Sequence, residues 1–170
     1  MKRLVVYKSS TGFTAKYATW IAEALSCEAK ELKRVSAQEV AQYDSIIFGG
    51  WIMGGMINGL DKMRKMNPSK LIVFAVGAAP DHEELRERIQ SQNHLEQTSF
   101  YYFEGGFDFE NMKFFPKLMI KMLRKSIAKK TEKTEQDKEM EKVLAGSFDH
   151  TDKAKIEPFV TLLKEEKGEM

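Results

Sequence analysis

The chain has little cysteine, histidine or proline, and it lacks a long hydrophobic run. Its single cysteine, Cys27, excludes an internal disulfide, and with no Cys or His close by in the sequence we expect an inert thiol. The histidines, His82, His94 and His150, are widely spaced, so no metal site is predicted. No apolar stretch approaches the roughly 20 residues of a membrane-spanning helix.

A secretory signal is not expected either. Lys2 and Arg3 precede an apolar run that is too short for a signal sequence and has no cleavage site, which predicts a cytoplasmic protein. The 170 residues are most simply one domain, residues 1–170, with a substantial core. The composition is that of a globular protein.

Charge is distributed unevenly along the chain. The net charge is +2, yet residues 113–133 contain eight basic residues and one acidic residue, Glu132. A block of this kind favours an anionic partner. No nucleic-acid-binding motif accompanies it, so nucleic acid is not expected. The basic residues are Lys113, Lys117, Lys121, Arg124, Lys125, Lys129, Lys130 and Lys133.

Continuous apolar runs alternate with amphipathic segments along most of the chain. Runs of this kind predict strands covered on both faces, as in a parallel sheet, and the alternation predicts a doubly wound α/β fold. Ligands of such folds bind where the strands end, and the four strongest runs all lead into small or glycine-rich loops. Strands are predicted at residues 4–7, 45–50, 71–77 and 99–106, with a weak edge strand at 28–35. Helices are predicted at residues 14–26, 37–42, 58–65, 81–92 and 153–164.

The loop after the first predicted strand is rich in hydroxyls. Backbone N–H groups at a helix N-terminus, joined by hydroxyl groups, form a binding site for phosphate. We therefore expect a phosphorylated ligand here. The loop consists of Ser9, Ser10, Thr11, Gly12, Phe13 and Thr14.

This loop resembles the flavodoxin phosphate loop, [S/T]-x-T-G-x-T. The resemblance implies FMN, with Ser9, Thr11 and Thr14 donating hydrogen bonds to its phosphate and Gly12 allowing close backbone approach. It also implies a five-stranded parallel sheet of order 2-1-3-4-5. Two further loops then correspond to those that hold the flavin ring. The first contains Gly50, Trp51, Ile52, Met53, Gly54, Gly55 and Met56, and the second Gly77, Ala78, Ala79, Pro80, Asp81 and His82.

Several residues of these two loops have alternative roles. Trp51 either stacks on the flavin or covers the sheet edge, and Met53 or Met56 could take its place on the ring. Asp81 is expected to cap the following helix. His82 is a candidate for the flavin edge or an ordinary surface residue. Many flavodoxins have a Tyr in the second loop where this chain has Ala and Pro, so one ring face is either open or covered by another element.

Residues 107–150 interrupt the alternation and predict a basic helical insertion before the last helix. Within it, residues 129–142 predict a solvated helix or a mobile linker. The aromatic and basic stretch at 105–123 is similar to the flavodoxin-domain branch that contains the menaquinone-dependent protoporphyrinogen IX dehydrogenases. The basic helix either packs its apolar stripe on the sheet or binds an anionic membrane surface, an acidic redox partner or porphyrin propionates.

Two functions follow from the resemblance. One is an FMN-dependent electron carrier between redox partner proteins. The other is an oxidoreductase like the protoporphyrinogen dehydrogenases, which passes electrons to a quinone at the inner face of the membrane. The basic insertion favours the second, whereas Phe107, Asp108 and Phe109 lack the basic residues expected there in those enzymes.

Overall fold

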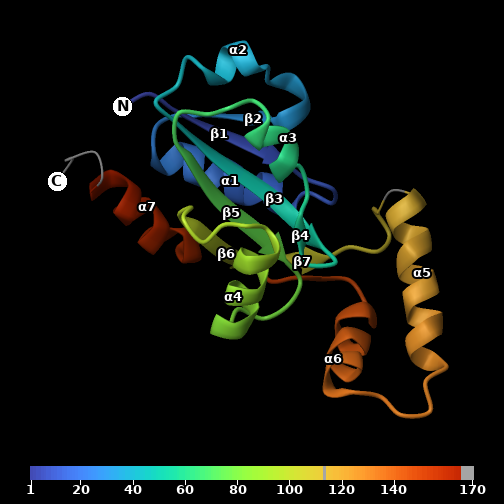
Figure 1. The fold of residues 1–170 in the computed structure, drawn as a ribbon. Coiled ribbons are helices and arrows are strands. Elements are labelled where there is room, and N and C mark those ends of the chain that lie inside the picture. Colours follow the sequence, from blue (N-terminus) through green and yellow to red (C-terminus); the bar gives the residue numbers. More distant parts are fainter. Residues whose placement is uncertain (113, 166–170) are drawn as a thin grey trace.

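A parallel β-sheet forms the centre of the molecule (Figure 1). The computed structural model describes residues 1–112 and 114–165. The parallel strands run in the order β2-β1-β3-β5-β6, which is the predicted 2-1-3-4-5 order of a doubly wound sheet. They are β1 (Arg3–Lys8), β2 (Glu28–Glu31), β3 (Ser45–Met53), β5 (Leu71–Gly77) and β6 (Phe100–Glu104).

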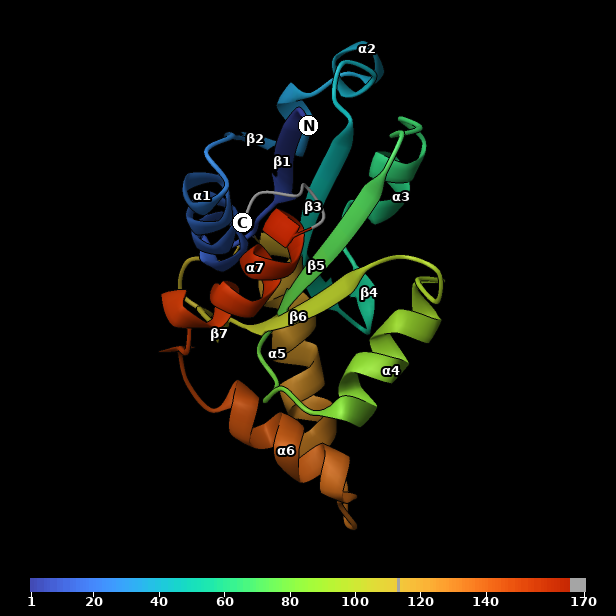
Figure 2. The same ribbon diagram turned by 90° about the vertical axis from the view of Figure 1, so that its left-hand side faces the viewer.

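Helices cover both faces of this sheet, as Figure 2 shows. On one face, α1 and α7 bury residues such as Tyr17 and Phe159 against Val5 and Ile47. On the other face, residues of η1, α2, α3 and α4 pack against strand residues such as Leu4 and Val73. Both sets of strand residues are fully buried, which explains the continuous apolar runs. The helices are α1 (Phe13–Ala24), α2 (Ala37–Val40), α3 (Leu60–Arg64), α4 (Glu83–Gln92) and α7 (Glu157–Glu165), with 3₁₀ turns η1 (Leu32–Arg34) and η2 (Lys153–Ile156).

Strand β3 continues beyond the glycines at which the sequence predicted its end. Gly49 and Gly50 are packing positions and not turn positions: a Cβ on Gly49 would lie 2.0 Å from the Phe74 ring, and one on Gly50 would lie 2.7 Å from the Asn58 carbonyl oxygen. The strand therefore runs on to Met53. The predicted end of this strand at Gly50 is therefore wrong, because residues 51–53 belong to the strand and not to the loop.

A β-hairpin takes the place of that loop. β3 pairs in antiparallel register with β4 (Met56–Ile57), with Ile52 opposite Ile57. The turn is formed by Gly54 and Gly55, whose φ angles are 58° and 82°. Two successive positive φ values are typical of the tight turns that match the twist of a hairpin.

Strand β2 is shorter than predicted. It ends at Glu31 and the chain then forms η1, because Leu32 turns inward and is only 4% exposed. At the other end of the chain, residues 153–156 are 3₁₀ and the α-helix begins at Glu157. Pro158 occupies the first turn of α7, where no backbone hydrogen bond is lost.

The insertion lies between β6 and the last helix, as predicted. It begins with β7 (Gly106–Phe107), continues through α5 (Phe114–Ala128) and α6 (Glu135–Leu144), and returns in β8 (Phe148–Asp149), which pairs with β7. The segment at 129–142 predicted as a solvated helix or linker is helical from Glu135 onward, and Thr134 and Asp137 form a capping box at the start of this helix. Within residues 1–112 and 114–165, every helix is too short or too polar to span a bilayer.

Helix α5 does not pack its apolar stripe on the sheet, so that alternative is wrong. Ile127 and, less completely buried, Ile120 pack into a small separate core with Phe107 and Leu144. Figure 1 shows α5 and α6 together, apart from the sheet. The insertion therefore has its own interior, built largely from its own residues.

Candidate functional site

The predicted site residues lie at one edge of the sheet, at or just beyond the carboxyl ends of three neighbouring strands, β1, β3 and β5. In the strand register Lys8 pairs with Gly50, and Trp51 pairs with Val76. The segments that continue β1, β3 and β5 therefore leave the sheet side by side. This edge includes the point between β1 and β3 where the strand order reverses, which is where doubly wound folds bind ligands.

The first of these segments joins β1 to α1. Gly12 is the N-cap of α1 with φ 98°, no side chain caps the helix, and no acidic residue lies in its first turn. The Gly12 amide donates to Ser9 Oγ at 3.1 Å, which closes the loop on itself. Thr14 lies in the first helical turn and is 1% exposed, while Ser10 and Thr11 are half-buried. The helix thus begins with amide groups that favour an anion.

The second segment is the β3–β4 hairpin, and the buried side chain of Asn93 holds it. Asn93 Oδ1 accepts from the Ile57 amide at 2.9 Å, and Nδ2 donates to the Gly55 carbonyl at 2.8 Å. Sequence reasoning missed Asn93, which directly follows α4 and has no motif around it. Trp51, Ile52 and Met53 are half-buried on this hairpin, and Met56 is 48% exposed.

The third segment follows β5 and is fixed by β6. Tyr102 Oη donates to the Ala79 carbonyl at 2.6 Å, and Glu104 Oε1 accepts from the Asp81 amide at 2.9 Å. Burial raises the pKa of Tyr102, and nearby carboxylates add to this, so the phenol stays protonated and keeps donating. Sequence reasoning missed both residues because they lie within an apolar strand pattern. Gly77 and Ala78 are half-buried and Pro80 is exposed.

His82, and not Asp81, is the cap of α4. His82 Nδ1 accepts from the Leu85 amide at 3.2 Å, whereas Asp81 forms an ion pair with Arg86 at 2.7 Å. The capping role predicted for Asp81 is therefore wrong by one residue. The reason is that the Asp81 amide is held by β6, which places the first helical turn one position later.

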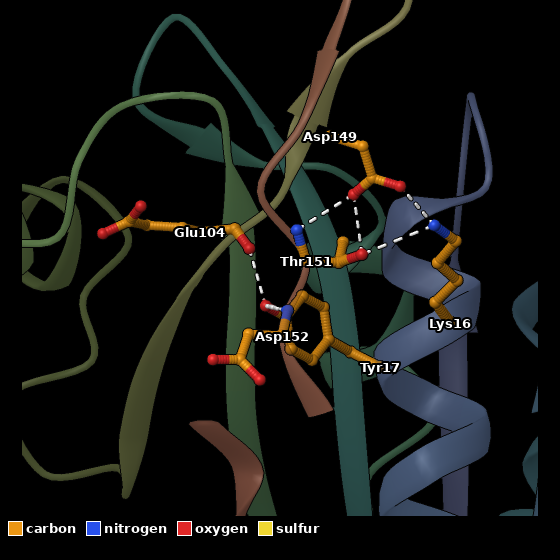
Figure 3. A network of polar contacts seen from close by, with 6 residues as sticks. All are labelled: Lys16, Tyr17, Glu104, Asp149, Thr151 and Asp152. Carbon is orange, nitrogen blue, oxygen red and sulfur yellow. Dashed lines mark hydrogen bonds and ion pairs between the residues drawn. The ribbon is translucent and has the colours of Figure 1, made fainter. Parts of the chain in front are cut away.

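The root of the insertion lies against the start of α1. Tyr17 Oη donates to the Glu104 carbonyl at 2.6 Å and accepts from the Asp152 amide at 3.2 Å (Figure 3). In the same figure Lys16 contacts Asp149 and Thr151. Burial raises the pKa of Tyr17, which keeps its donor proton in place.

The insertion core also reaches the third segment. Ala78 packs against the cluster of Phe107, Ile127 and Leu144. Within the insertion, the Arg124 guanidinium lies 4.3 Å from the centre of the Phe109 ring, and Lys117 Nζ lies 4.9 Å from it. An element outside the three segments, and not a Tyr within them, thus borders the loop after β5.

A model of the flavodoxin domain family matches residues 4–154 of the chain. The chain belongs to the flavodoxin domain family. The strand order of the sheet is that of flavodoxin-like doubly wound folds, so the fold agrees with membership.

Individual relatives and structures are less similar. An uncharacterized protein of Methanocaldococcus jannaschii, MJ0298, is 33% identical over 103 residues, which are 54% of this chain and 68% of that protein. An archaeal flavodoxin structure has a TM-score of 0.46 at 16% identity, covering 61% of this chain and 83% of the other. The structure of oxidised flavodoxin 2 of Bacillus cereus has a TM-score of 0.46 at 19% identity, and the match covers 85% of this chain and 96% of that one.

Proposed function

We propose that the protein binds FMN non-covalently at the carboxyl edge of the sheet and transfers electrons through it. FMN supplies the redox chemistry when bound, and the protein contributes binding, orientation and electrostatics. The observation that carries the proposal is the start of α1, which has no side-chain cap and no acidic residue in its first turn. Membership of the flavodoxin domain family supports it.

The residues at this edge fit the chemistry of a flavin phosphate. Hydroxyls of Ser9, Thr11 and Thr14 and the amides of the first turn of α1 would hold the phosphate without a lysine. A Cβ on Gly12 would meet nothing within 4 Å, so space is open above the loop. The β3–β4 hairpin, with Trp51, Met53 or Met56, and the segment that contains Ala78 would border the ring.

A flavin titration tests this proposal. Purified protein, freed of bound flavin, is titrated with FMN and with riboflavin, while flavin fluorescence and absorbance are followed. FMN should bind at least tenfold more tightly, because riboflavin lacks the phosphate. Thr11→Val should weaken FMN binding about 10-fold and leave riboflavin binding unchanged. Thr161→Val, an exposed site on α7, is the matched control. Equal affinity for the two flavins, or no binding of either, contradicts the proposal.

An enzyme related to the protoporphyrinogen dehydrogenases is the second candidate. The specific observation in its favour is that Ala78, a small residue in the loop after β5, lies against the insertion, where Lys117 and Arg124 surround Phe109. The small side chain of Ala78 would leave room beside the flavin ring, and the nearby cations would attract an anionic substrate to it. Anaerobic oxidation of protoporphyrinogen with menaquinone as acceptor tests it. No turnover, together with reduction of the bound flavin by a ferredoxin reductase, favours the carrier.

A further inference from the structure

The outer face of α5 exposes large apolar side chains. Leu118 and Met122 are 44% and 66% exposed, and Met119 and Leu123 are 57% and 38% exposed. Each pair is spaced by four residues, so the two pairs form neighbouring rows on the helix surface. Ile120 and Ile127 on the other side of the helix pack into the insertion core. Contiguous exposed apolar surface of this kind marks an interaction site.

A row of lysines lies beside this apolar face. Lys121, Lys125 and Lys129 are exposed and follow each other at intervals of four residues. None of the three forms an ion pair with a residue in the described part of the chain. Other lysines of the insertion are paired, for example Lys130 with Asp137 and Lys133 with Glu141. The free charge is therefore concentrated next to the apolar rows, and α5 contains no acidic residue.

From this arrangement we infer that α5 lies on an anionic phospholipid surface, with its apolar rows among the acyl chains near the headgroups and its lysines at the phosphates. A lipid surface fits better than an acidic protein because the apolar side chains project from a convex helix. A protein partner would need a matching groove, whereas lipids adapt to the helix. The inference does not depend on FMN, since α5 lies outside the three segments.

Vesicle binding by the full chain tests this inference. The protein is sedimented with vesicles of phosphatidylcholine alone and with vesicles in which about a third of the lipid is phosphatidylglycerol. We expect binding only to the anionic vesicles, decreasing as salt is added. The triple change Lys121→Gln, Lys125→Gln and Lys129→Gln should reduce binding about 100-fold. The matched control changes three exposed lysines elsewhere, Lys62, Lys65 and Lys155, to Gln and should bind normally.

Insertion of the apolar face has a separate readout. Met122→Trp should show blue-shifted fluorescence and quenching by brominated lipids in anionic vesicles, whereas Leu162→Trp on α7 should show neither. Circular dichroism establishes that each variant is folded. The inference is overturned if the parent protein does not sediment with anionic vesicles. It is also overturned if the variant with all three α5 lysines changed to Gln sediments with them as well as the parent does. Binding to a polyglutamate peptide but not to anionic vesicles also overturns it, in favour of an acidic protein partner.

Discussion

Lys16 in α1 forms an ion pair with Asp149 in β8, 133 residues further along the chain (Figure 3). The pair connects the helix that begins at the phosphate-loop candidate with the strand by which the insertion returns. Phe13 reinforces the same contact, since a Cβ on Gly106 would lie 2.5 Å from its ring. Two parts of the chain that function separately in our proposals are thus in direct contact.

Asp149→Asn should lower stability by less than about 1 kcal/mol at pH 7, because both partners are 45% exposed. Burial raises the pKa of Asp149, but hydrogen bonds from Lys16 and Thr151 outweigh it and lower the pKa to about 2. The pKa of an Asp in the unfolded chain is about 3.9. The stabilisation by ionised Asp149 is therefore complete above about pH 4 and is lost as the pH falls toward 2. Thermal melts at pH 7 and pH 3 compare the melting temperatures of the parent protein and Asp149→Asn, with Glu96→Gln as the control. A difference in melting temperature between parent and Asp149→Asn that grows toward pH 3 would contradict the expectation.

Gly49→Ala should destabilise the fold by about 1–3 kcal/mol, because the new Cβ would overlap the buried ring of Phe74. Urea denaturation measures the change. Gly146→Ala is the matched control, since a Cβ there would meet nothing within 4 Å. If the two variants are equally stable, the close approach of Gly49 to Phe74 is not as described.

Asn93→Ala should cost about 2–4 kcal/mol, because it leaves the Ile57 amide and the Gly55 carbonyl without their buried partner. Hydrogen exchange should accelerate most at Ile57, which locates the effect in the hairpin. Asn111→Ala, at an exposed site, is the control and should change stability by less than about 0.5 kcal/mol. If exchange is faster throughout the sheet and not fastest in the hairpin, Asn93 does not act by holding the β3–β4 hairpin.

Cys27 should react slowly with thiol reagents in the folded protein. Burial raises the pKa of this thiol, and the smaller effect of Arg3 does not compensate. Since the thiolate is the reactive form, alkylation at pH 8 should be more than about tenfold slower in the native state than in urea. Mass spectrometry over time provides the rates. Equal rates would show that Cys27 is accessible and would end its assignment as inert.

Much of the sheet could be predicted from the sequence because its signals are local. Continuous apolar runs gave β1 and β5 nearly to the residue, and their alternation with helices indicated the class of fold. The glycines after the third run misled the prediction. Gly49 is required by a ring on β5, a neighbour that local sequence does not reveal, so a packing position resembled a turn.

The supports of the site were harder to predict for the same reason. Asn93, Tyr102 and Glu104 hold the second and third segments by hydrogen bonds to residues 23 to 38 positions away in the chain, and none of the three belongs to a motif. By contrast, the residues of the phosphate-loop candidate are consecutive and could be found directly. The role of the α5 stripe was also open, because helical periodicity gives an apolar face but not the surface that covers it.

The pairing of β7 with β8 means that the insertion leaves and re-enters the sheet domain at one point, where Gly106 lies opposite Asp149. A segment attached in this way can be lengthened, shortened or exchanged without changing the order or pairing of the strands of the main sheet. The surface of α5 can therefore change while the three segments at the carboxyl edge of the sheet stay as they are.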